Sequence, residues 1–487
     1  MSLSREEVVK GLTEILGADN VITDETVLKE SSIDRYRKYE QCHEVYELPI
    51  PAAVAYVNST EDVAKVLKFA NDNLINVVPR TGHSAIEGGL ETQKENSIVL
   101  DGSNMNKILN IDTYNMQVTC QCGVPLQDLD DRLRKMGYTT GHSPQSKPLA
   151  QMGGLVATRS IGQFSTLYGG IEDMLVGCEV VFPGGKICRI KNVPRRSVGP
   201  DIRHIVLGNE GALCFITEVT VKIFKYQPEN NRFLGYKIKT MSNGFKALRE
   251  VMVQGYKPSV ARLYDFGDAA ANFDWADGEN VLLFMAEGPA EITRVTASAI
   301  DQIVRRIDGV TPVDPKLIEK WFNHLNWGAE QIAQEREEIL ATNNIGITTE
   351  ISADWENIDK IYSSTIDRLK EEVPDLTMCG GHSSHQYING TNLYFVYYYN
   401  VECKPEEEMN KYHNLINRII CEQTVKYGGS IAHHHGLGKA RAHYVYQEYG
   451  SSIYMLETLK KAFDPNGIMN AGCLLPLKVN KENPWIF

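Results

Sequence analysis

Long apolar runs are missing from this sequence of 487 residues. No stretch approaches the roughly 20 apolar residues that a helix needs to cross a bilayer. The N-terminal segment carries several charges and lacks the uninterrupted apolar core of a secretory signal. Ser4 fits the N-cap of an amphipathic helix instead. These absences predict a cytoplasmic protein with no integral membrane segment.

A basic excess and a cysteine framework are also missing. The net charge of −12 argues against a nucleic-acid partner, because neutralising phosphates requires a basic face. Ten cysteines are scattered through apolar or strand-like segments. Cys120 and Cys122 form a C-x-C with no second pair nearby, so no zinc site built on cysteines is predicted. The pattern favours reduced and mostly buried thiols.

The remaining composition is that of a globular protein, with 43% hydrophobic and 23% charged residues. A chain of this length is expected to form two or three cores. Residues 50–125 alternate strands and helices in small α/β units. After about residue 226, the pattern of expected strands and helices is that of an α+β sheet domain. The main expected strands are 52–57, 75–80, 97–101, 233–240, 281–288 and 392–401, and the main expected helices are 61–73 and 289–309.

Two glycine-rich segments stand out. The first, PRTGHSAIEGGL (79–90), directly follows an expected strand. Glycine allows positive φ and close backbone approach, and consecutive amides can form a nest for an anion. The segment lacks the G-x-G-x-x-G and helix of a Rossmann site. A second cluster runs from Met152 to Gly170, and two such loops about 65 residues apart suit a long dinucleotide held at two places.

Several ordered segments carry a family resemblance. PRTGHSAIEGG, HSPQSKPLAQMGGLVATRSIG, YGGIEDMLVGCEVVFPGGK and GPDIRHIVLGNEGALCFITEVT resemble the FAD domain of the vanillyl-alcohol oxidase / p-cresol methylhydroxylase (PCMH) superfamily. SVARLYD (259–265), INGTNLYF (388–395) and IAHHHGLGK (431–439) extend the similarity over most of the chain. The nearest branch contains alkylglycerone-phosphate synthase and the glycolate/D-lactate-type FAD dehydrogenases.

The resemblance implies an α+β fold in which two subdomains of PCMH type hold FAD and an α+β cap domain covers the flavin. The expected parts are an N-terminal helical segment (1–45), the FAD-binding domain (46–225), the cap or substrate domain (226–460) and a C-terminal return to the FAD domain (461–487). The residues that match cofactor-binding positions are Pro79, Arg80, Thr81, Gly82, His83, Ser84, Gly88, Gly89, Pro144, Ser146, Gly153, Gly154, Thr158, Tyr168, Gly169, Asp173, Glu210, Gly211 and Ile216.

His83 departs from the pattern, since the nearest relatives normally have a third glycine at this position. Gly82-His83-Ser84 resembles a run that, in sugar-alcohol and aldonolactone oxidases, carries the histidine bonded covalently to the flavin 8α-carbon. Two interpretations are open. The histidine is either a covalent attachment point for FAD or a noncovalent hydrogen-bond donor to the cofactor or substrate.

Candidate catalytic residues lie in the expected cap. His433, His434 and His435 are adjacent, and imidazoles titrate near neutral pH, which suits proton transfer from a substrate. In an extended segment, His433 and His435 would share one face and His434 the other. Tyr394 matches a catalytic tyrosine of the synthase. Arg262 either pairs with Asp265 or projects into a pocket to bind an anion, as the matching arginine of the synthase implies.

A divalent metal is not predicted. The D-lactate-type dehydrogenases use two histidines and a glutamate here. His382 is retained, but Tyr394 lies near the second ligand position and His434 replaces the glutamate. The hard carboxylate ligand is therefore lost, although zinc tolerates imidazoles.

The leading hypothesis is an FAD-dependent oxidoreductase that oxidises a hydroxyl-bearing small molecule, a 2-hydroxy acid or an alcohol, by hydride transfer to flavin N5. Oxygen, a quinone or an electron-acceptor protein would then reoxidise the flavin, and a homodimer is the default assembly. The first alternative is acyl-to-alkyl exchange as in the synthase, which the histidine run and Tyr394 favour and His83 opposes. The second alternative is a non-catalytic electron-relay subunit.

Overall fold

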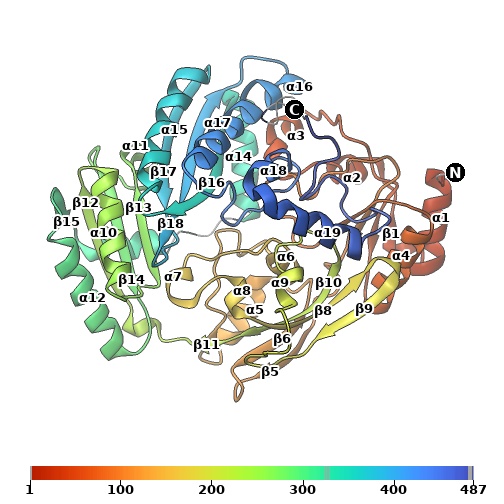
Figure 1. Ribbon diagram of the computed structural model, residues 1–487, viewed down its shortest axis with the longest axis horizontal. Helices are drawn as coiled ribbons and strands as arrows, with labels where there is room; N and C mark the ends of the chain where they lie inside the picture. The colour runs from red at the N-terminus through yellow and green to blue at the C-terminus, as the bar shows by residue number, and fades with distance from the viewer. Residues whose placement is uncertain (1–2, 324, 326–327, 481–484, 486–487) are drawn as a thin grey trace.

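The computed structural model of the chain describes residues 3–323, 325, 328–480 and 485. Three main sheets with their own helices make up the fold (Figure 1). The four-stranded sheet begins with β1 on the right of this view, the five-stranded sheet lies at the bottom, and the seven-stranded sheet with its helices lies at the left and top. The first sheet is mostly parallel and the other two are antiparallel, each packed with helices, so the predicted α+β class is confirmed.

The four-stranded sheet has the order β1-β2-β4-β3, in which β2, β4 and β3 are parallel and β1 pairs antiparallel with β2. The predicted N-cap is confirmed, because Ser4 and Glu7 form a capping box at the start of α1. The elements are α1 Arg5–Leu16, β1 Val21–Ile22, α2 Glu25–Glu30, α3 Lys38–Cys42, β2 Ala53–Tyr56, α4 Thr60–Asp72, β3 Val77–Arg80 and β4 Ile98–Asp101.

The five-stranded sheet is antiparallel, with the order β5-β6-β10-β8-β9. The second glycine cluster, predicted as a loop, instead begins helix α6. A Cβ atom on Gly153 would lie 2.5 Å from Cβ of Cys122, so glycine is what allows this helix to pack so closely. The elements are β5 Ile108–Asp112, β6 Gln117–Gln121, α5 Leu126–Arg134, α6 Met152–Ala157, α7 Ser165–Tyr168, α8 Ile171–Met174, β8 Leu175–Phe182, β9 Lys186–Ile190, α9 Arg203–Val206 and β10 Phe215–Lys222. Strands β7 (Tyr138–Thr139) and β11 (Phe224–Lys225) form a small separate pair.

The seven-stranded sheet has the order β15-β12-β14-β13-β17-β18-β16. Helices α10, α12, α15 and α17 cover one face, and the residues between them form the largest apolar core. Side chains alternate along β18 as the two faces of a strand require. Phe395 and Tyr397 enter the helix-covered core, whereas Tyr394, Val396 and Tyr398 face the opposite side and line a cavity.

The bounds of the elements in this third unit are β12 Arg232–Ile238, α10 Met241–Val253, β13 Val260–Tyr264, α11 Phe266–Asn272, β14 Asn280–Ala286, α12 Ala290–Val304, β15 Val310–Pro312, α13 Pro315–Phe322, α14 Ala329–Thr342, β16 Asn344–Asp354, α15 Ile358–Glu372, β17 Leu376–Ser383, β18 Gly390–Asn400, α16 Pro405–Glu408 and α17 Asn414–Lys426. A π-helical turn at Met409–His413 precedes α17. The strands and helices predicted in this region are confirmed.

The last helices lead the chain back to the first sheet. Helices α18 (Val445–Tyr449) and α19 (Ile453–Phe463), drawn in dark blue in Figure 1, lie beside the N-terminal units. The Val77 amide donates to the Ile468 carbonyl at 2.7 Å, and the Asn470 amide donates to the Val77 carbonyl at 2.8 Å. Met469 is fully buried in the core of the four-stranded sheet. A segment near residue 470 therefore completes a sheet formed near residue 77.

All ten cysteines are free thiols, and most of them are buried, as predicted. Among the described residues, no helix combines the length and apolar character that crossing a membrane requires.

Replacing Met469 with alanine should lower the free energy of unfolding by about 2–5 kcal/mol, because it leaves a cavity in the first core. Urea denaturation followed by circular dichroism measures this change. Met455→Ala is the matched control, since Met455 is 66% exposed on α19. Equal stability of the two variants would contradict a structural role for the returning segment.

Candidate active site

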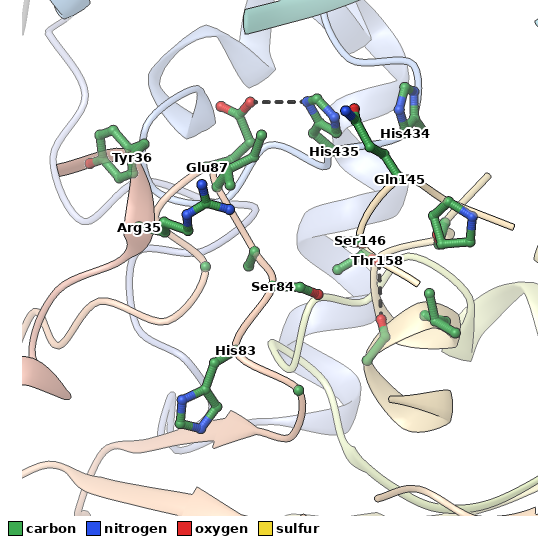
Figure 2. A pocket seen from close by; sticks show the side chains of 18 of the residues that line it. Arg35, Tyr36, His83, Ser84, Glu87, Gln145, Ser146, Thr158, His434 and His435 are labelled. Carbon is green, nitrogen blue, oxygen red and sulfur yellow. Dashed lines mark hydrogen bonds and ion pairs between the residues drawn. The ribbon is translucent and has the colours of Figure 1, made fainter. Parts of the chain in front are cut away.

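A cavity of about 480 Å³ lies between the three sheets. Figure 2 shows Ser84 on one loop, Ser146 and Thr158 across from it, and His434 and His435 in the upper part of the view. The predicted cofactor residues that line the cavity are Pro79, Arg80, Thr81, Gly82, His83, Ser84, Gly89, Pro144, Ser146, Gly153, Gly154, Thr158, Glu210, Gly211 and Ile216. The predicted catalytic residues that line it are Arg262, Tyr394, His434 and His435.

Four predicted cofactor residues and one predicted catalytic residue do not line the cavity; they are Gly88, Tyr168, Gly169, Asp173 and His433. The Tyr168 hydroxyl donates to Glu287 at 2.7 Å. Asp173 accepts the Gly170 amide at 3.1 Å and so caps α8. Gly88 and Gly169 have φ of 77° and 84°, which favours glycine at both turns. These contacts are structural, and a direct role of the four in cofactor binding stays a prediction.

The first glycine loop presents unbonded amides. Among the described residues, none accepts a hydrogen bond from the main-chain N–H groups of residues 82–87. A Cβ atom on Gly82 would lie 2.5 Å from the Leu149 carbonyl oxygen, so the loop touches the second cofactor segment there. His83 adopts a φ of 53°, in the left-handed region. A run of free amides bent by such backbone angles is a nest that suits an anion.

Arg80 does not offer a free charge to this loop. Its side chain is buried, and the guanidinium donates to Asp101 at 2.7 Å and to Ser31 at 2.8 Å. Nε2 of His83 lies 3.1 Å from the same carboxylate. Burial raises the pKa of Asp101, but the hydrogen bond to His83 and the charge of Arg80 outweigh it and lower that pKa to about 2. Asp101 is therefore an anchor for both ends of the Arg80–His83 turn.

Tyr394, His434 and Arg262 form the polar wall on the cap side of the cavity. The Tyr394 hydroxyl lies 2.5 Å from Nε2 of His434. Burial, helped by the charge of Glu350, raises the pKa of Tyr394 well above its usual value. The phenol is therefore neutral at neutral pH and is hydrogen-bonded to an imidazole that can exchange its proton.

Arg262 projects into the cavity, which was one of the two alternatives left open by the sequence. Asp265 does not pair with it, because that carboxylate caps α11 by accepting the Asp268 amide at 2.8 Å. The Arg262 guanidinium donates to the Tyr264 hydroxyl at 2.5 Å and lies 5.4 Å from the Trp321 ring. Its Nε is buried and has no hydrogen-bond partner among the described residues. This leaves donor capacity for an anion in the cavity.

The alternation predicted for the histidine run is wrong, because the run is a loop and not a strand. The main-chain amides of His433, His434 and His435 all donate to the carboxylate of Glu350. Three amides converging on one carboxylate bend the backbone and turn adjacent side chains to the same side. His434 and His435 consequently line the cavity, while His433 packs on His385.

Glu350 and Arg441 form a fully buried ion pair behind this loop, with Nη1 of Arg441 at 3.0 Å from Oε2 of Glu350. Arg441 also lies 3.0 Å from Glu87 of the first glycine loop, and Figure 2 shows that Glu87 points at His435. Burial opposes ionisation of Glu350, but the charge of Arg441 outweighs it and holds the pKa of the carboxyl well below its usual range. One ion-pair network thus joins the cap sheet, the histidine loop and the glycine loop.

The sequence prediction missed Glu350, Arg441, Glu87, His385 and Tyr387. Glu87 carried a signal, because it is a lone carboxylate within the glycine loop. His385 carried one also, since it follows His382 in an H-x-x-H spacing. His382 also lines the cavity, where its Nδ1 lies 2.6 Å from Asp268 and its ring stacks on Tyr394.

Two sequence families match the chain. Residues 51–191 match the family described as FAD binding domain, and residues 227–474 match the family described as FAD linked oxidases, C-terminal domain. Fold and site therefore define a two-part α+β flavoprotein. The chain belongs to the FAD-linked oxidase family, and it is an FAD-dependent oxidoreductase.

The similar proteins differ in what they do. An Escherichia coli (strain K12) protein named Uncharacterized FAD-linked oxidoreductase YgcU is 63% identical, over 98% of this chain and 100% of its own length. The alkyldihydroxyacetonephosphate synthase of Caenorhabditis elegans is 29% identical, over 88% of this chain and 76% of its own. The mitochondrial D-lactate dehydrogenase [cytochrome] of Arabidopsis thaliana is 24% identical, over 97% and 83%.

Solved structures show the same fold. An alkyldihydroxyacetonephosphate synthase aligns with a TM-score of 0.76 at 22% identity, covering 98% of this chain and 85% of that one. p-Cresol methylhydroxylase aligns with a TM-score of 0.72 at 15% identity, covering 98% of both chains. The predicted resemblance to this superfamily is confirmed.

The residues of the cavity fit FAD. The free amides of residues 82–87 and the Ser84 hydroxyl suit the pyrophosphate, which needs several donors and close backbone approach. Gly153 and Gly154 at the start of α6 bring a helix N-terminus to the same cavity. The cap residues Arg262, Tyr394 and His434 form the wall that faces these cofactor loops.

Replacing Glu350 with glutamine should destabilise the protein by about 1.5–3 kcal/mol, because Arg441 would keep only Glu87 as its partner and three main-chain amides would lose a charged acceptor. Urea denaturation measures the loss. Glu356→Gln removes an exposed pair with Lys360 and should have little effect. If both variants unfolded at the same urea concentration, Glu350 would not be the anchor of the histidine loop.

Proposed function

We propose that the chain oxidises a small substrate that carries a hydroxyl group and an anionic end. The observation that carries this proposal is the Tyr394–His434 hydrogen bond, 2.5 Å long, on the same cavity wall as Arg262. A proton acceptor and an anion-binding guanidinium side by side suit a hydroxy acid. The name of the Arabidopsis relative, a D-lactate dehydrogenase, supports the same substrate class.

Oxidation of a secondary alcohol removes two electrons and two protons and leaves a ketone. FAD bound in this cavity supplies the two-electron acceptor, and oxygen, a quinone or an electron-acceptor protein takes the electrons onward. The hydroxyl proton must pass to the protein, and the Tyr394–His434 pair offers it a hydrogen-bonded route from phenol to imidazole. His435 lines the same cavity and is the alternative proton acceptor.

Arg262 orients the substrate in this proposal. The guanidinium is held in place by its contact with the Trp321 ring and by its hydrogen bond to the Tyr264 hydroxyl. A carboxylate that contacts this guanidinium would therefore meet a positioned donor group without ordering a mobile side chain.

Acyl-to-alkyl exchange is the second candidate function. The C. elegans relative is named for that activity, and the histidine run with Tyr394 was the feature of the sequence that favoured it. Membership of an oxidoreductase family favours oxidation, and it favours an enzyme over an electron-relay subunit.

Anaerobic mixing with a panel of 2-hydroxy acids, aromatic alcohols and sugar alcohols should bleach the flavin lastingly with a 2-hydroxy acid. Tyr394→Phe should slow the bleaching by about 10²- to 10⁴-fold, the usual contribution of a positioned proton-transfer group.

Arg262→Met should weaken binding of the acid by roughly 10- to 150-fold, since a hydrogen bond to a charged group contributes about 1.5–3 kcal/mol. Stopped-flow absorbance measures both effects.

Tyr114→Phe serves as the control for this series, because Tyr114 is 94% exposed and lies outside the cavity. An Arg262→Met variant that weakened uncharged alcohols as strongly as acids would contradict the assigned anion contact. Exchange of an acyl chain for a fatty alcohol, with the flavin oxidised at the end, would replace the proposal by the second candidate.

The last prediction for the cofactor is a covalent bond between FAD and His83. With Nε2 engaged by Asp101, the carboxylate favours a proton on Nε2 and leaves the lone pair on Nδ1, the form that can hold a bond to carbon. We expect the yellow colour to stay with the protein after acid precipitation and to be released from His83→Gly. Colour in the supernatant of the wild-type protein would show that FAD is held by noncovalent contacts alone.

A further inference from the structure

Three imidazoles, those of His385, His433 and His434, converge at one wall of the cavity. One ring nitrogen from each lies within 4.8 Å of the others. Nδ1 of His433 and Nδ1 of His434 are 2.8 Å apart. Ligand atoms at tetrahedral positions around zinc, about 2.0–2.1 Å from the ion, are roughly 3.3 Å apart. The cluster thus needs to open by only a few tenths of an ångström to place these two nitrogens on one ion.

The outer nitrogen of each ring is bonded to a hydroxyl group. A histidine that ligates a metal usually uses its second nitrogen in this way, which fixes the ring and its tautomer. The three pairs are His385 Nδ1 with Ser165 at 2.8 Å, His433 Nε2 with Tyr387 at 2.7 Å and His434 Nε2 with Tyr394 at 2.5 Å. The remaining nitrogens are Nε2 of His385 and the Nδ1 atoms of His433 and His434, which share a hydrogen bond that the ion would replace.

The nearby carboxylate of Glu350 does not compete, since three main-chain amides and Arg441 already occupy it.

We propose that His385, His433 and His434 bind one divalent ion of the zinc type. His385 and His434 line the cavity, so an open fourth position would face it and accept an oxygen atom of the substrate. The site differs from the one that the sequence considered and rejected, which relied on His382. That residue is bonded to Asp268 instead. The proposal goes beyond the proposed function and does not depend on which substrate is oxidised. With Nδ1 of His434 on the ion, Nε2 carries a hydrogen toward Tyr394, so His435 is then the proton acceptor.

The test is metal binding to the untagged holoenzyme without substrate. After dialysis against a chelator, titration with ZnCl₂ and with CoCl₂ should saturate at one ion per chain, and cobalt should give the visible bands of a tetrahedral site in difference spectra against the flavin. Elemental analysis of the dialysed complex gives the stoichiometry. A failure of the oxidation assays would leave these measurements unaffected.

Variants locate the ion. Tyr387→Phe should weaken binding by about 10- to 100-fold, the usual effect of removing a partner of a ligating histidine. His385→Ala and His433→Ala should weaken it further, and His382→Ala, the matched control, should bind as the wild type does. Flavin absorbance and the melting temperature show whether each variant is folded.

The proposal fails if the wild-type holoenzyme binds neither ion saturably. It also fails if His385→Ala and His433→Ala bind as tightly as the wild type. Loss of binding in His382→Ala, with binding kept in His433→Ala, would place the ion at His382 and overturn the assignment.

Discussion

The buried ion pair between Glu350 and Arg441 is the constraint on which the active site depends. Both side chains are excluded from solvent, so each requires the other. Glu350 also accepts hydrogen bonds from the main-chain amides of the histidine loop, and Arg441 also forms an ion pair with Glu87 beside the cofactor loop. The positions of His434 and His435 therefore follow from a charge pair that neither residue belongs to.

The two sides of the cavity differ in the kind of group that they present. The cofactor side consists largely of glycines, backbone amides and hydroxyl groups, and Arg80, at the start of the first glycine loop, is neutralised by Asp101. The cap side consists of titratable and charged side chains on strands and on the histidine loop. Backbone donors hold an anion whatever the pH, whereas side chains that exchange protons must be placed by other side chains. The structure meets the second need with buried ion pairs and hydroxyl groups.

Local patterns made part of this predictable. The glycine loop, Tyr394 on an aromatic strand and the N-cap at Ser4 can be read from neighbouring residues, because close approach, strand alternation and capping are local effects. The turn of the histidine run cannot be read in that way. It depends on Glu350, which lies 85 residues before His435, and nothing in the run itself shows that three amides share one acceptor. The packing of His433 on His385 likewise depends on a residue far away in the sequence.

The pairing of Val77 with the segment around Met469 has a consequence for biosynthesis. The first sheet begins near the N-terminus, yet a part of its core arrives some 390 residues later, after the whole cap has left the ribosome. Domains that fold as they emerge normally need only the residues already made. Here the cofactor-binding half must wait for the chain to return, so the order of synthesis favours folding the cap before the flavin pocket is closed.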